Sequence, residues 1–369
     1  MVSTFPPRPC GIATFAEHLT EALRSIGARV DEVELSEAAP TSATRAAVLI
    51  EGQPLRTSAA LKVANQADVV VLQHEYGIWG GPSGEEVLAF SGATTSPLLV
   101  VAHTVLSCPT PDQRRILEAL CLDAAVVVVM SHWAQRRLTM AYDVDPGCVV
   151  VIPHGAATRP QLPDLRQDGT LSLLTWGLLG RGKGVENVLD ALALLGHDAA
   201  KVHYRIAGAT HPKVLAHEGE AYRNMLMDKV ADLGLASSVH FDQRYLAPND
   251  LDALLRQVSL VVLPYDSIDQ VTSGVLVDAL GAGKPVLSTN FPHAIELLSG
   301  GAGVLVDRAN PMAIAAELRR LLAAPSLLDT MSRAATALAP SLQWRTVAEQ
   351  YLKAAAAVDA SRTLAGSRR

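Results

Sequence analysis

Short aliphatic runs recur along the chain, and longer stretches with helical spacing separate them. The first half contains four such runs, at residues 69–73, 98–102, 125–130 and 149–152. The second half contains six, at residues 171–176, 202–208, 238–241, 259–264, 285–289 and 303–306. Continuous apolar strands that alternate with helices indicate parallel sheets covered on both faces. The pattern therefore predicts an α/β chain with two doubly wound, Rossmann-like domains that face each other across a cleft.

A polar, proline-rich segment separates the two groups of strands. Residues 156–170 (AATRPQLPDLRQDGT) show no apolar period, which is typical of a linker. We predict an N-terminal domain over residues 1–160 and a C-terminal domain over residues 161–338. The chain opens on MVSTFPP, so its first strand has at most four residues. Either the sequence begins inside that strand, or this edge of the sheet is thin.

Composition narrows the class of protein. The chain has 369 residues, 49% of them hydrophobic, and this length suits about two domains by the ~150-residue guide. A formal net charge of −6 gives no support to nucleic acid or an anionic membrane as an electrostatic partner. The four cysteines form no Cys-x-x-Cys pair, which favours a reducing cytosol over a disulfide framework. There is no signal peptide and no uninterrupted apolar stretch of about 18 residues, so we expect a cytoplasmic protein. Peripheral contact with the inner face of a membrane stays open.

A glycine-rich stretch with two cations follows the strand at residues 171–176. The sequence GLLGRGKG (177–184) holds four glycines with Arg181 and Lys183 among them, and a helical pattern begins directly afterwards. Glycines let a backbone approach an anion closely, and a helix start offers unpaired N–H groups with a favourable dipole. The stretch therefore predicts a site for a diphosphate.

The same stretch admits a rival interpretation. Residues Gly177 to Lys183 match G-x-x-x-x-G-K, the phosphate loop of NTPases. The match fails at the next position, where the Ser or Thr that would hold Mg²⁺ is Gly184. A P-loop-like NTPase is thus the weaker alternative.

A second candidate anion site lies at QVTSGVLVDALGAGKPV (270–286). Ser273 and Gly274 are expected to open a helix after the strand at residues 259–264, and the free N–H groups from Thr272 to Gly274 would form a second anion cradle beside the first. Asp278 lies about one turn into this helix, where a carboxylate can accept hydrogen bonds from the vicinal hydroxyls of a ribose. Such charge-assisted bonds are worth roughly 1.5–3 kcal/mol each when desolvated. A nucleoside diphosphate accounts for both features, because its phosphates need the N–H groups and its ribose needs the carboxylate of Asp278.

Taken together, these segments resemble the family-4 retaining glycosyltransferases of the GT-B fold over nearly the full chain. The stretches in the first half are STFPPRPCGIATF (3–15), LQHEYGIWGG (72–81), VAHTVL (101–106) and VIPHG (151–155). Those in the second half are GLLGRGKGVENVLDAL (177–192), AGATHP (207–212) and QVTSGVLVDALGAGKPVLST (270–289). SLQWRTVAEQYL (341–352) resembles the family's terminal helix, so residues 339–360 are expected to cross back to the N-terminal domain. The details look most like the branch with bacterial mannosyltransferases.

The resemblance assigns roles to the residues that match the family's motifs. It implies that the second domain binds a nucleotide sugar and the first binds the acceptor. Lys183 matches the family's phosphate-binding lysine; the family's arginine position is Leu178 here, and Arg181 is the candidate substitute. The family's two glutamates, eight positions apart, correspond to Gln270 and Asp278. Asp278 would keep the ribose role. Gln270 would keep a hydrogen-bonding group near the donor sugar but would lack the charge of the family's glutamate.

The implied reaction is attack of an acceptor hydroxyl on the anomeric carbon of a hexose, with retained configuration. The leaving diphosphate can take the acceptor's proton, so no protein nucleophile is needed. Preorganised donors would stabilise the charge on that diphosphate. The candidates are Lys183, Arg181 and the amides from Thr272 to Gly274. We expect no resident cofactor and no metal site, hence a metal-independent mechanism.

Further candidates follow strands or open helices. His103 follows the strand at residues 98–102, and the resemblance places it near the donor sugar. Gly11 would open the first helix under the diphosphate, and His211 would line the nucleotide pocket. His74 and Glu75 follow the strand at residues 69–73 and are interpreted as acceptor-side or domain-closure residues.

The sequence identifies the substrates only in part. The mannosyltransferase resemblance favours GDP-mannose as donor, although no residue reads guanine by a stated mechanism. The acceptor is a glycan, a lipid-linked glycan or a small molecule. A degenerate relative that binds the nucleotide sugar without transferring it is a further alternative, motivated by Gln270 and Leu178.

Overall fold

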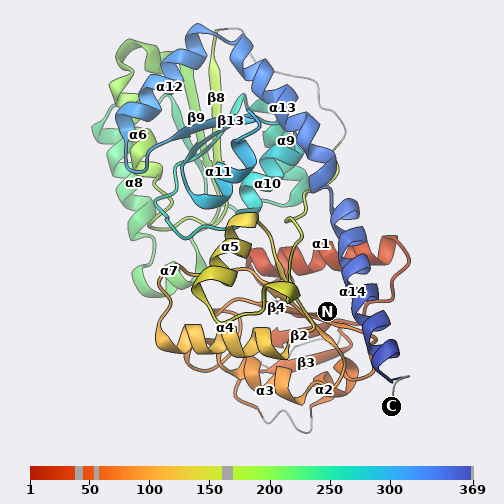
Figure 1. Ribbon diagram of the computed structural model, residues 1–369. Helices are drawn as coiled ribbons and strands as arrows, with labels where there is room; N and C mark the ends of the chain where they lie inside the picture. The colour runs from red at the N-terminus through yellow and green to blue at the C-terminus, as the bar shows by residue number, and fades with distance from the viewer. Residues whose placement is uncertain (38–44, 54–57, 160–168, 367–369) are drawn as a thin grey trace. The chain divides into compact units, whose positions relative to one another are not determined.

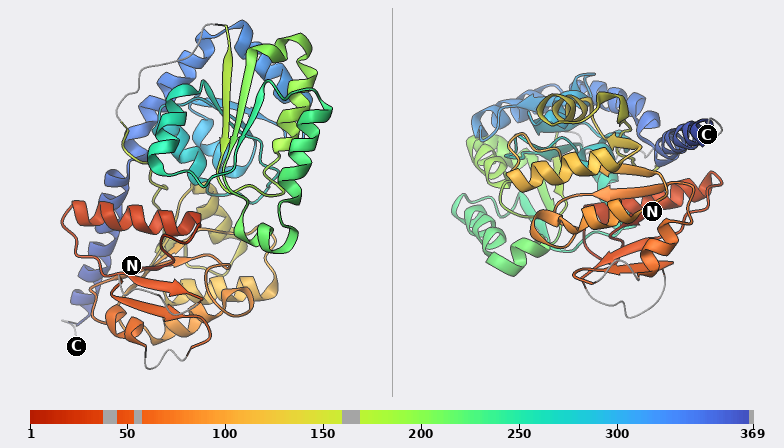
Figure 2. Two further views of the ribbon diagram at one scale, coloured as in Figure 1. Left: turned by 180° about the vertical axis from the view of Figure 1, so that it is seen from behind. Right: turned by 60° about the horizontal axis from the view of Figure 1, so that its bottom comes forward.

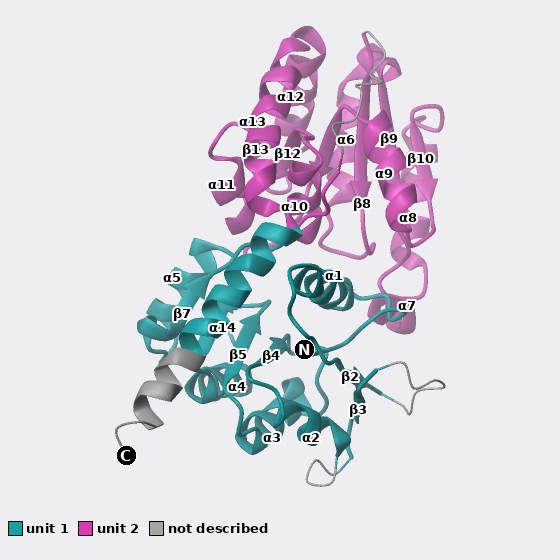
Figure 3. Cartoon of the chain, turned by 90° about the vertical axis from the view of Figure 1, so that its right-hand side faces the viewer, with its two compact units in different colours: residues 1–155, 344–369 teal, residues 156–343 magenta. Residues whose placement is uncertain are grey.

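The computed structural model describes residues 1–37, 45–53, 58–159 and 169–366 (Figure 1). The chain forms two compact units, which Figure 3 distinguishes by colour: unit 1 is Met1–Gly155 with Trp344–Arg369, and unit 2 is Ala156–Gln343. The boundary predicted between residues 160 and 161, and most of the predicted linker, lie outside the described residues. Both units contain one parallel sheet with helices on its two faces, so the predicted fold class is confirmed.

The sheet of unit 2 has six parallel strands in the order β10-β9-β8-β11-β12-β13. The strands are β8 (Leu171–Trp176), β9 (Val202–Ala207), β10 (Val239–Asp242), β11 (Leu260–Leu263), β12 (Val286–Thr289) and β13 (Gly303–Val306). All six coincide, to within one residue at either end, with predicted runs, which are mainly apolar although β9 (VHYRIA) and β10 (VHFD) also carry polar residues. The order reverses direction between β8 and β11, which makes this pair the topological switch point of a Rossmann-like sheet.

Helices cover both faces of this sheet (Figures 1 and 2). One face packs against α6 (Val185–Leu194), α8 (Ala221–Asp232) and α12 (Pro311–Ala323). The other packs against α9 (Pro248–Gln257), α10 (Gly274–Gly281), α11 (Pro292–Leu298) and α13 (Ser326–Leu342). Within β11, Leu260 and Val262 enter the first core, whereas Val261 and Leu263 enter the second. This alternation explains why a fully buried strand needs apolar residues at every position.

The sheet of unit 1 has seven parallel strands in the order β3-β2-β1-β4-β5-β6-β7. The strands are β1 (Val2–Ser3), β2 (Val33–Ser36), β3 (Ala47–Ile50), β4 (Val70–His74), β5 (Leu98–Ala102), β6 (Val126–Val129) and β7 (Val149–Val151). The two-residue strand β1 lies between β2 and β4, so the short strand is inside the sheet and not at a thin edge. β2 and β3 were not among the predicted runs. β2 (VELS) alternates apolar and polar residues, as suits a strand near the sheet's edge.

Two helix layers also cover the sheet of unit 1. One core includes α1 (Gly11–Ser25) and α14 (Trp344–Gly366), in which the chain returns to this unit after α13 ends at Leu342. The other includes α2 (Ala59–Ala64), α3 (Glu86–Ala93) and α4 (Pro111–Asp123). The remaining helical segments are α5 (His132–Ala141), α7 (Pro212–Glu218) and the short 3₁₀ helices η2 (Pro82–Gly84), η3 (Pro146–Cys148) and η4 (Gly196–Lys201). None of the described helices combines the length and the apolar character that crossing a membrane requires.

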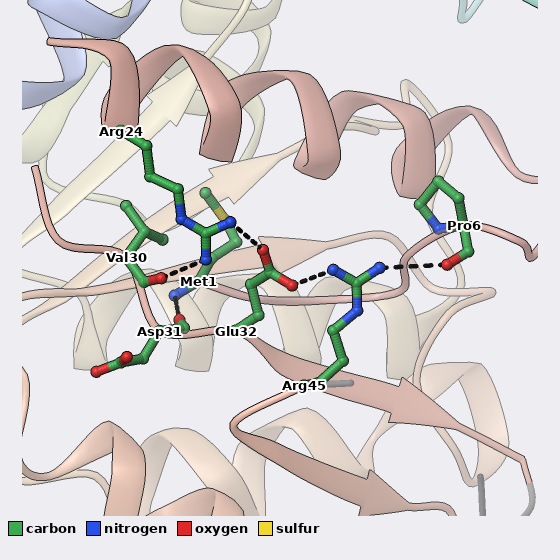
Figure 4. Close-up of polar contacts among 7 residues, drawn as sticks. All are labelled: Met1, Pro6, Arg24, Val30, Asp31, Glu32 and Arg45. Atoms are coloured by element: carbon green, nitrogen blue, oxygen red, sulfur yellow. Dashed lines mark hydrogen bonds and ion pairs between the residues drawn. The ribbon is translucent and has the colours of Figure 1, made fainter. Parts of the chain in front are cut away.

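A buried carboxylate ties the amino-terminal elements of unit 1 together (Figure 4). Glu32 is 7% exposed and accepts from Arg24 of α1 at 2.8 Å and from Arg45, which precedes β3. Arg45 also donates to the carbonyl of Pro6 at 3.3 Å. A buried charge is tolerated only when it is paired in this way, so the network fixes the loop before α1 relative to β2 and β3.

Candidate functional site

The candidate site of unit 2 lies where two loops leave the switch point of its sheet. The glycine-rich loop (residues 177–184) follows β8, and the segment 264–273 follows the neighbouring strand β11. Ligands of open α/β sheets bind outside the carboxyl ends of the strands at such a point. The two stretches that the sequence singled out are therefore adjacent in space.

Backbone contacts hold the two loops against each other. The amide of Asp266 donates to the carbonyl of Gly182 at 2.9 Å. Gly184 has φ +67°, and a Cβ placed on it would lie 1.9 Å from the carbonyl oxygen of Pro264. A Cβ on Gly177 would lie 3.5 Å from Val275 Cγ2, which places the start of the glycine-rich loop beside the first turn of α10.

This packing argues against the NTPase alternative. A phosphate loop needs a Ser or Thr at position 184 to hold Mg²⁺. The structure leaves no room there for any Cβ, because the carbonyl of Pro264 occupies that space and the backbone is left-handed. Glycine at this position is a requirement of the fold, and the G-x-x-x-x-G-K match is coincidental.

Lys183 presents its charge without a carboxylate partner. Among the described residues no carboxylate lies within ion-pairing distance of its ammonium, which is 4.2 Å from the ring centroid of Tyr265. The nearby Asp266 pairs instead with Arg308 at 3.1 Å. A half-buried ammonium beside glycine backbone and a helix start is suited to bind an anion.

Arg181 and His211 have structural partners of their own. Arg181 is 65% exposed and pairs with Glu218 of α7 at 2.9 Å. His211 is the N-cap of α7, where its Nδ1 accepts the amide of Lys213 at 3.2 Å. A parallel bridge between Leu179 and Thr210 joins the segment before His211 to the glycine-rich loop. Arg181 thus belongs to the glycine-rich loop and His211 lies beside it. Their predicted phosphate and nucleotide contacts stay predictions.

The start of α10 follows the sequence prediction in its local geometry. Gly274 is its first residue, and the hydroxyl of Ser273 accepts the amide of Leu276 at 3.3 Å as N-cap. The amide of Ser273, however, donates to Nδ1 of the buried His293 at 2.8 Å. The amides of Gly274 and Val275 lie in the first turn, where a helix offers no acceptor of its own. They are better placed than the amide of Ser273 to meet an anion.

Gln270 closes the turn that precedes α10. Its Nε2 donates to the carbonyl of Thr272 at 2.7 Å, which leaves Oε1 as a neutral acceptor. A glutamate, which the resemblance implies at this position, could not donate this bond when ionised. The hydroxyl of Thr272 is buried and has no hydrogen-bond partner among the described residues.

We expect Gln270→Glu to weaken this turn rather than to restore a missing function. The carboxylate would face the carbonyl of Thr272, and losing the bond costs about 1 kcal/mol before repulsion is added. Thermal unfolding should show a lower Tm for Gln270→Glu than for Gln270→Ala, which loses the bond without the repulsion. A Tm equal to that of the native chain, with tighter binding of a sugar nucleotide, would contradict this account.

Asp278, the predicted ribose ligand, already has a basic neighbour. Its Oδ1 lies 3.5 Å from Nη1 of Arg159, whose Nε donates to Asp252 at 2.6 Å. The side chain of Arg159 is 6% exposed and that of Asp278 is 30% exposed. The long contact to Arg159 leaves the partly exposed carboxylate able to accept further hydrogen bonds.

The sequence contains two Asp-x-Asp triplets, which in other transferases hold a metal. Asp250 pairs with Arg244 at 3.5 Å, and Asp252 pairs with Arg159. In the other triplet, Asp145 caps a 3₁₀ helix by accepting the amide of Gly147 at 2.8 Å. Within the described ranges, no group of three or more His, Cys, Asp or Glu side chains could hold a metal ion.

In unit 1, the predicted histidines lie at the carboxyl ends of strands, and the predicted glycine opens a helix. Gly11 is the first residue of α1, and His74 is the last of β4. Nε2 of His103, directly after β5, is 2.6 Å from Oε1 of the buried Gln73, whose Nε2 donates to the sulfur of Met1. This amide orientation makes His103 the donor and so assigns its proton to Nε2.

Burial keeps the two histidines neutral. It lowers the pKa of His74 to about 4 and, with His154 and His74 adding to the effect, the pKa of His103 to about 3. Neither ring nitrogen of His74 has a hydrogen-bond partner among the described residues, and its ring lies edge-on to Tyr76. His103 therefore offers Nδ1 as an acceptor, not as an acid.

Aromatic side chains surround the point where the chain leaves and re-enters unit 1. The ring of Phe15 makes edge contacts with His103 at 4.9 Å, His154 at 5.0 Å and Trp344 at 5.0 Å between centroids. A Cβ on Gly155 would lie 2.1 Å from the ring of Trp344, so only glycine fits beside it. His154, in the VIPHG stretch, thus contributes to packing at this point.

Sequence reasoning missed three residues that support the candidates. Tyr265 lies under Lys183, His293 accepts the amide of Ser273, and Gln73 fixes the proton of His103. Tyr265 and His293 come shortly after β11 and β12, and Gln73 is the second-last residue of β4. A position near the carboxyl end of a strand is the signal that could have identified them.

Known proteins resemble this chain in sequence and in fold. Residues 164–338 match the family model described as "Glycosyl transferases group 1". The chain is 28% identical over 198 residues to a D-inositol 3-phosphate glycosyltransferase of Nocardiopsis dassonvillei, over 53% of this chain and 45% of that protein. The matched region spans less than half the length of the curated relatives.

Two solved structures resemble the whole chain. The sucrose-phosphate synthase from Thermosynechococcus elongatus has a TM-score of 0.76 and 16% identity, covering 99% of this chain and 98% of that one. HepE from Anabaena, solved in complex with UDP, has a TM-score of 0.75 and 18% identity, covering 96% and 99%. The chain therefore has the two-domain fold of the GT-B glycosyltransferases, and the segment that matches the group 1 glycosyltransferase family is the one that builds unit 2.

Proposed function

We propose that this protein is a glycosyltransferase that moves a hexose from a nucleoside diphosphate sugar to an acceptor hydroxyl. Unit 2 binds the donor, and unit 1 supplies the acceptor-side residues. The acceptor is a glycan, a lipid-linked glycan or a small molecule. The family match over unit 2 and the curated relatives support this class of activity.

One observation carries the proposal. The ammonium of Lys183, which pairs with no carboxylate of the described residues, lies at the switch point of unit 2. A loop that only glycine can form and the first turn of α10 lie there too. Together they provide a cation, close backbone approach and unpaired amides for a diphosphate. Asp278, on the same helix, provides the acceptor for ribose hydroxyls.

The chemistry follows from a diphosphate held in this way. The acceptor oxygen forms a bond to the anomeric carbon while the bond from that carbon to the diphosphate oxygen breaks. The acceptor's proton passes to the leaving diphosphate on the same face, so the configuration is retained. Lys183 and the amides of Gly274 and Val275 stabilise the charge that develops on the leaving group, and losing one such donor commonly costs about 10²–10³ in rate. A mechanism of this kind proceeds without a metal ion.

The donor that the resemblance favours is GDP-mannose. The solved neighbour HepE was crystallised with UDP, so uridine donors are the competing choice to test. The curated relatives are named for D-inositol 3-phosphate, which makes a phosphorylated cyclitol one small-molecule acceptor to include.

The test is thermal unfolding with GDP-mannose, UDP-glucose, UDP-GlcNAc, ADP-glucose, ATP and GTP, each with and without Mg²⁺. We expect one sugar nucleotide to raise the Tm without Mg²⁺. We expect Lys183→Ala and Asp278→Ala to lower its affinity by about 10- to 100-fold, as the loss of a charge-assisted hydrogen bond predicts. Lys201→Ala, which removes a lysine in an exposed ion pair with Asp198, and Asp232→Ala on the exposed side of α8 are the matched controls.

Two results would overturn the proposal. Stabilisation only by ATP or GTP with Mg²⁺, unaffected by Asp278→Ala, would restore the NTPase alternative. Binding of a sugar nucleotide with neither transfer nor slow hydrolysis would identify a degenerate binding protein. The anomeric configuration of the product, read by NMR, separates retention from inversion.

A further inference from the structure

Tyr265 is a buried aromatic residue at the centre of the candidate site. It follows β11 and is 2% exposed. Its ring stacks on that of Phe291, with centroids 5.4 Å apart and planes at 20°. Its carbonyl accepts the hydroxyl of Thr289 at 2.7 Å. The ring is thus fixed from behind by the segment that follows β12.

Lys183 lies over the ring of Tyr265. Its ammonium lies 4.2 Å from the ring centroid of Tyr265, within the range of a cation–π interaction. The adjacent residue Asp266 is 53% exposed in its side chain and is held by Arg308, so it does not neutralise the lysine. The loop contact between Asp266 and Gly182 keeps the two backbones in register.

We propose that Tyr265 is the positioning residue for Lys183: its ring face holds the ammonium at the diphosphate site and keeps it charged without a carboxylate partner. The inference rests on the proposed function, since it assumes that Lys183 binds the donor's diphosphate. A carboxylate in place of the ring would hold the lysine equally well, but it would repel the phosphates. An aromatic face attracts the cation and leaves its charge available to an anion.

The hydroxyl of Tyr265 has no part in this role. It is buried and has no hydrogen-bond partner among the described residues. Replacing it by hydrogen therefore removes an unsatisfied polar group and leaves the ring face intact. Tyr265→Phe should retain donor affinity and unfold at an equal or higher temperature.

The experiment is a double-mutant cycle on the dissociation constants of GDP-mannose and UDP-glucose, measured by calorimetry. We expect Tyr265→Phe to bind within about twofold of the native chain and Tyr265→Leu to bind about tenfold more weakly, the span of a cation–π interaction. In the Lys183→Ala background, Tyr265→Leu should have no further effect. Additive losses would show that the ring acts through something other than Lys183 and would overturn the inference.

A shape-preserving series covers the case in which Tyr265→Leu does not fold. Phenylalanine with zero, two and three ring fluorines at position 265 keeps the packing and progressively weakens the ring's attraction for a cation. Donor affinity should fall stepwise with fluorine number while the Tm without ligand stays constant; unchanged affinity overturns the inference. If Lys183→Ala binds both donors as tightly as the native chain, the proposed donor site itself fails, which distinguishes that outcome from failure of the inference.

Discussion

Gly184→Ala should abolish donor binding and destabilise unit 2 by more than about 3 kcal/mol. Two costs add. A residue with a Cβ at φ +67° carries backbone strain of order 1 kcal/mol. The Cβ would also lie 1.9 Å from the carbonyl oxygen of Pro264, so the glycine-rich loop or the end of β11 must move. Either movement separates the two loops that form the candidate site.

The measurement is urea unfolding together with the Tm shift produced by the sugar nucleotide that stabilises the native chain. Gly196→Ala is the matched control, because its φ of +62° is similar but no heavy atom lies within 4 Å of the added Cβ. It should show only the conformational cost and retain donor binding. If Gly184→Ala proved as mild as Gly196→Ala, the loop would not be fixed by Pro264.

Gly184→Thr separates the two interpretations of the glycine-rich loop. An NTPase would gain the hydroxyl that its Mg²⁺ site lacks, and Mg²⁺-dependent ATP binding should appear. The packing against Pro264 predicts the opposite result, an unstable unit 2 without nucleotide binding. Appearance of Mg²⁺-ATP binding in this variant would contradict our account of the loop.

Most of the fold could be predicted from the sequence, because the central strands of both sheets are runs of mainly apolar residues. Every strand from β4 to β13 matched a predicted run, whereas β2 (VELS) and β3 (AVLI), which have four residues each, were not among the predicted runs. β1 was expected to be short, but its place inside the sheet depends on strand pairing with β2 and β4, which a single strand does not encode.

The sequence predicted those features of the candidate site that depend on residues close together in the chain. Helix starts at Gly11 and Gly274 follow from capping and glycine chemistry, which act within four residues. The contacts that tune the site are long-range: Asp278 meets Arg159 from 119 residues away, and Ser273 meets His293 from 20 residues away. Such pairings arise from the order of the strands, so sequence periodicity does not predict them. The roles of the candidate residues stay predictions until they are tested by substitution.

The second large effect that we expect is acid destabilisation of unit 1. The folded state lowers the pKa of His74 to about 4, below the ordinary value of about 6.5 that it regains on unfolding. Between these two values the unfolded chain binds more protons than the folded one, so the free energy of unfolding falls as the pH is lowered from about 6.5 to about 4. A shift of this size corresponds to about 3 kcal/mol for His74 alone. His103, with a pKa of about 3, contributes in the same direction.

His74→Leu should remove one histidine's share of this dependence. Neither nitrogen of His74 has a described partner, so the substitution loses no hydrogen bond and removes two buried polar atoms. Urea unfolding at pH 7 should show equal or higher stability for His74→Leu, and the slope of stability against pH between 6 and 5 should fall by up to one proton. His197→Leu, at a side chain that is 93% exposed, is the control and should leave the slope unchanged. An unchanged slope in His74→Leu would mean that His74 is protonated as readily in the folded chain as in the unfolded one, and that the end of β4 is open to water.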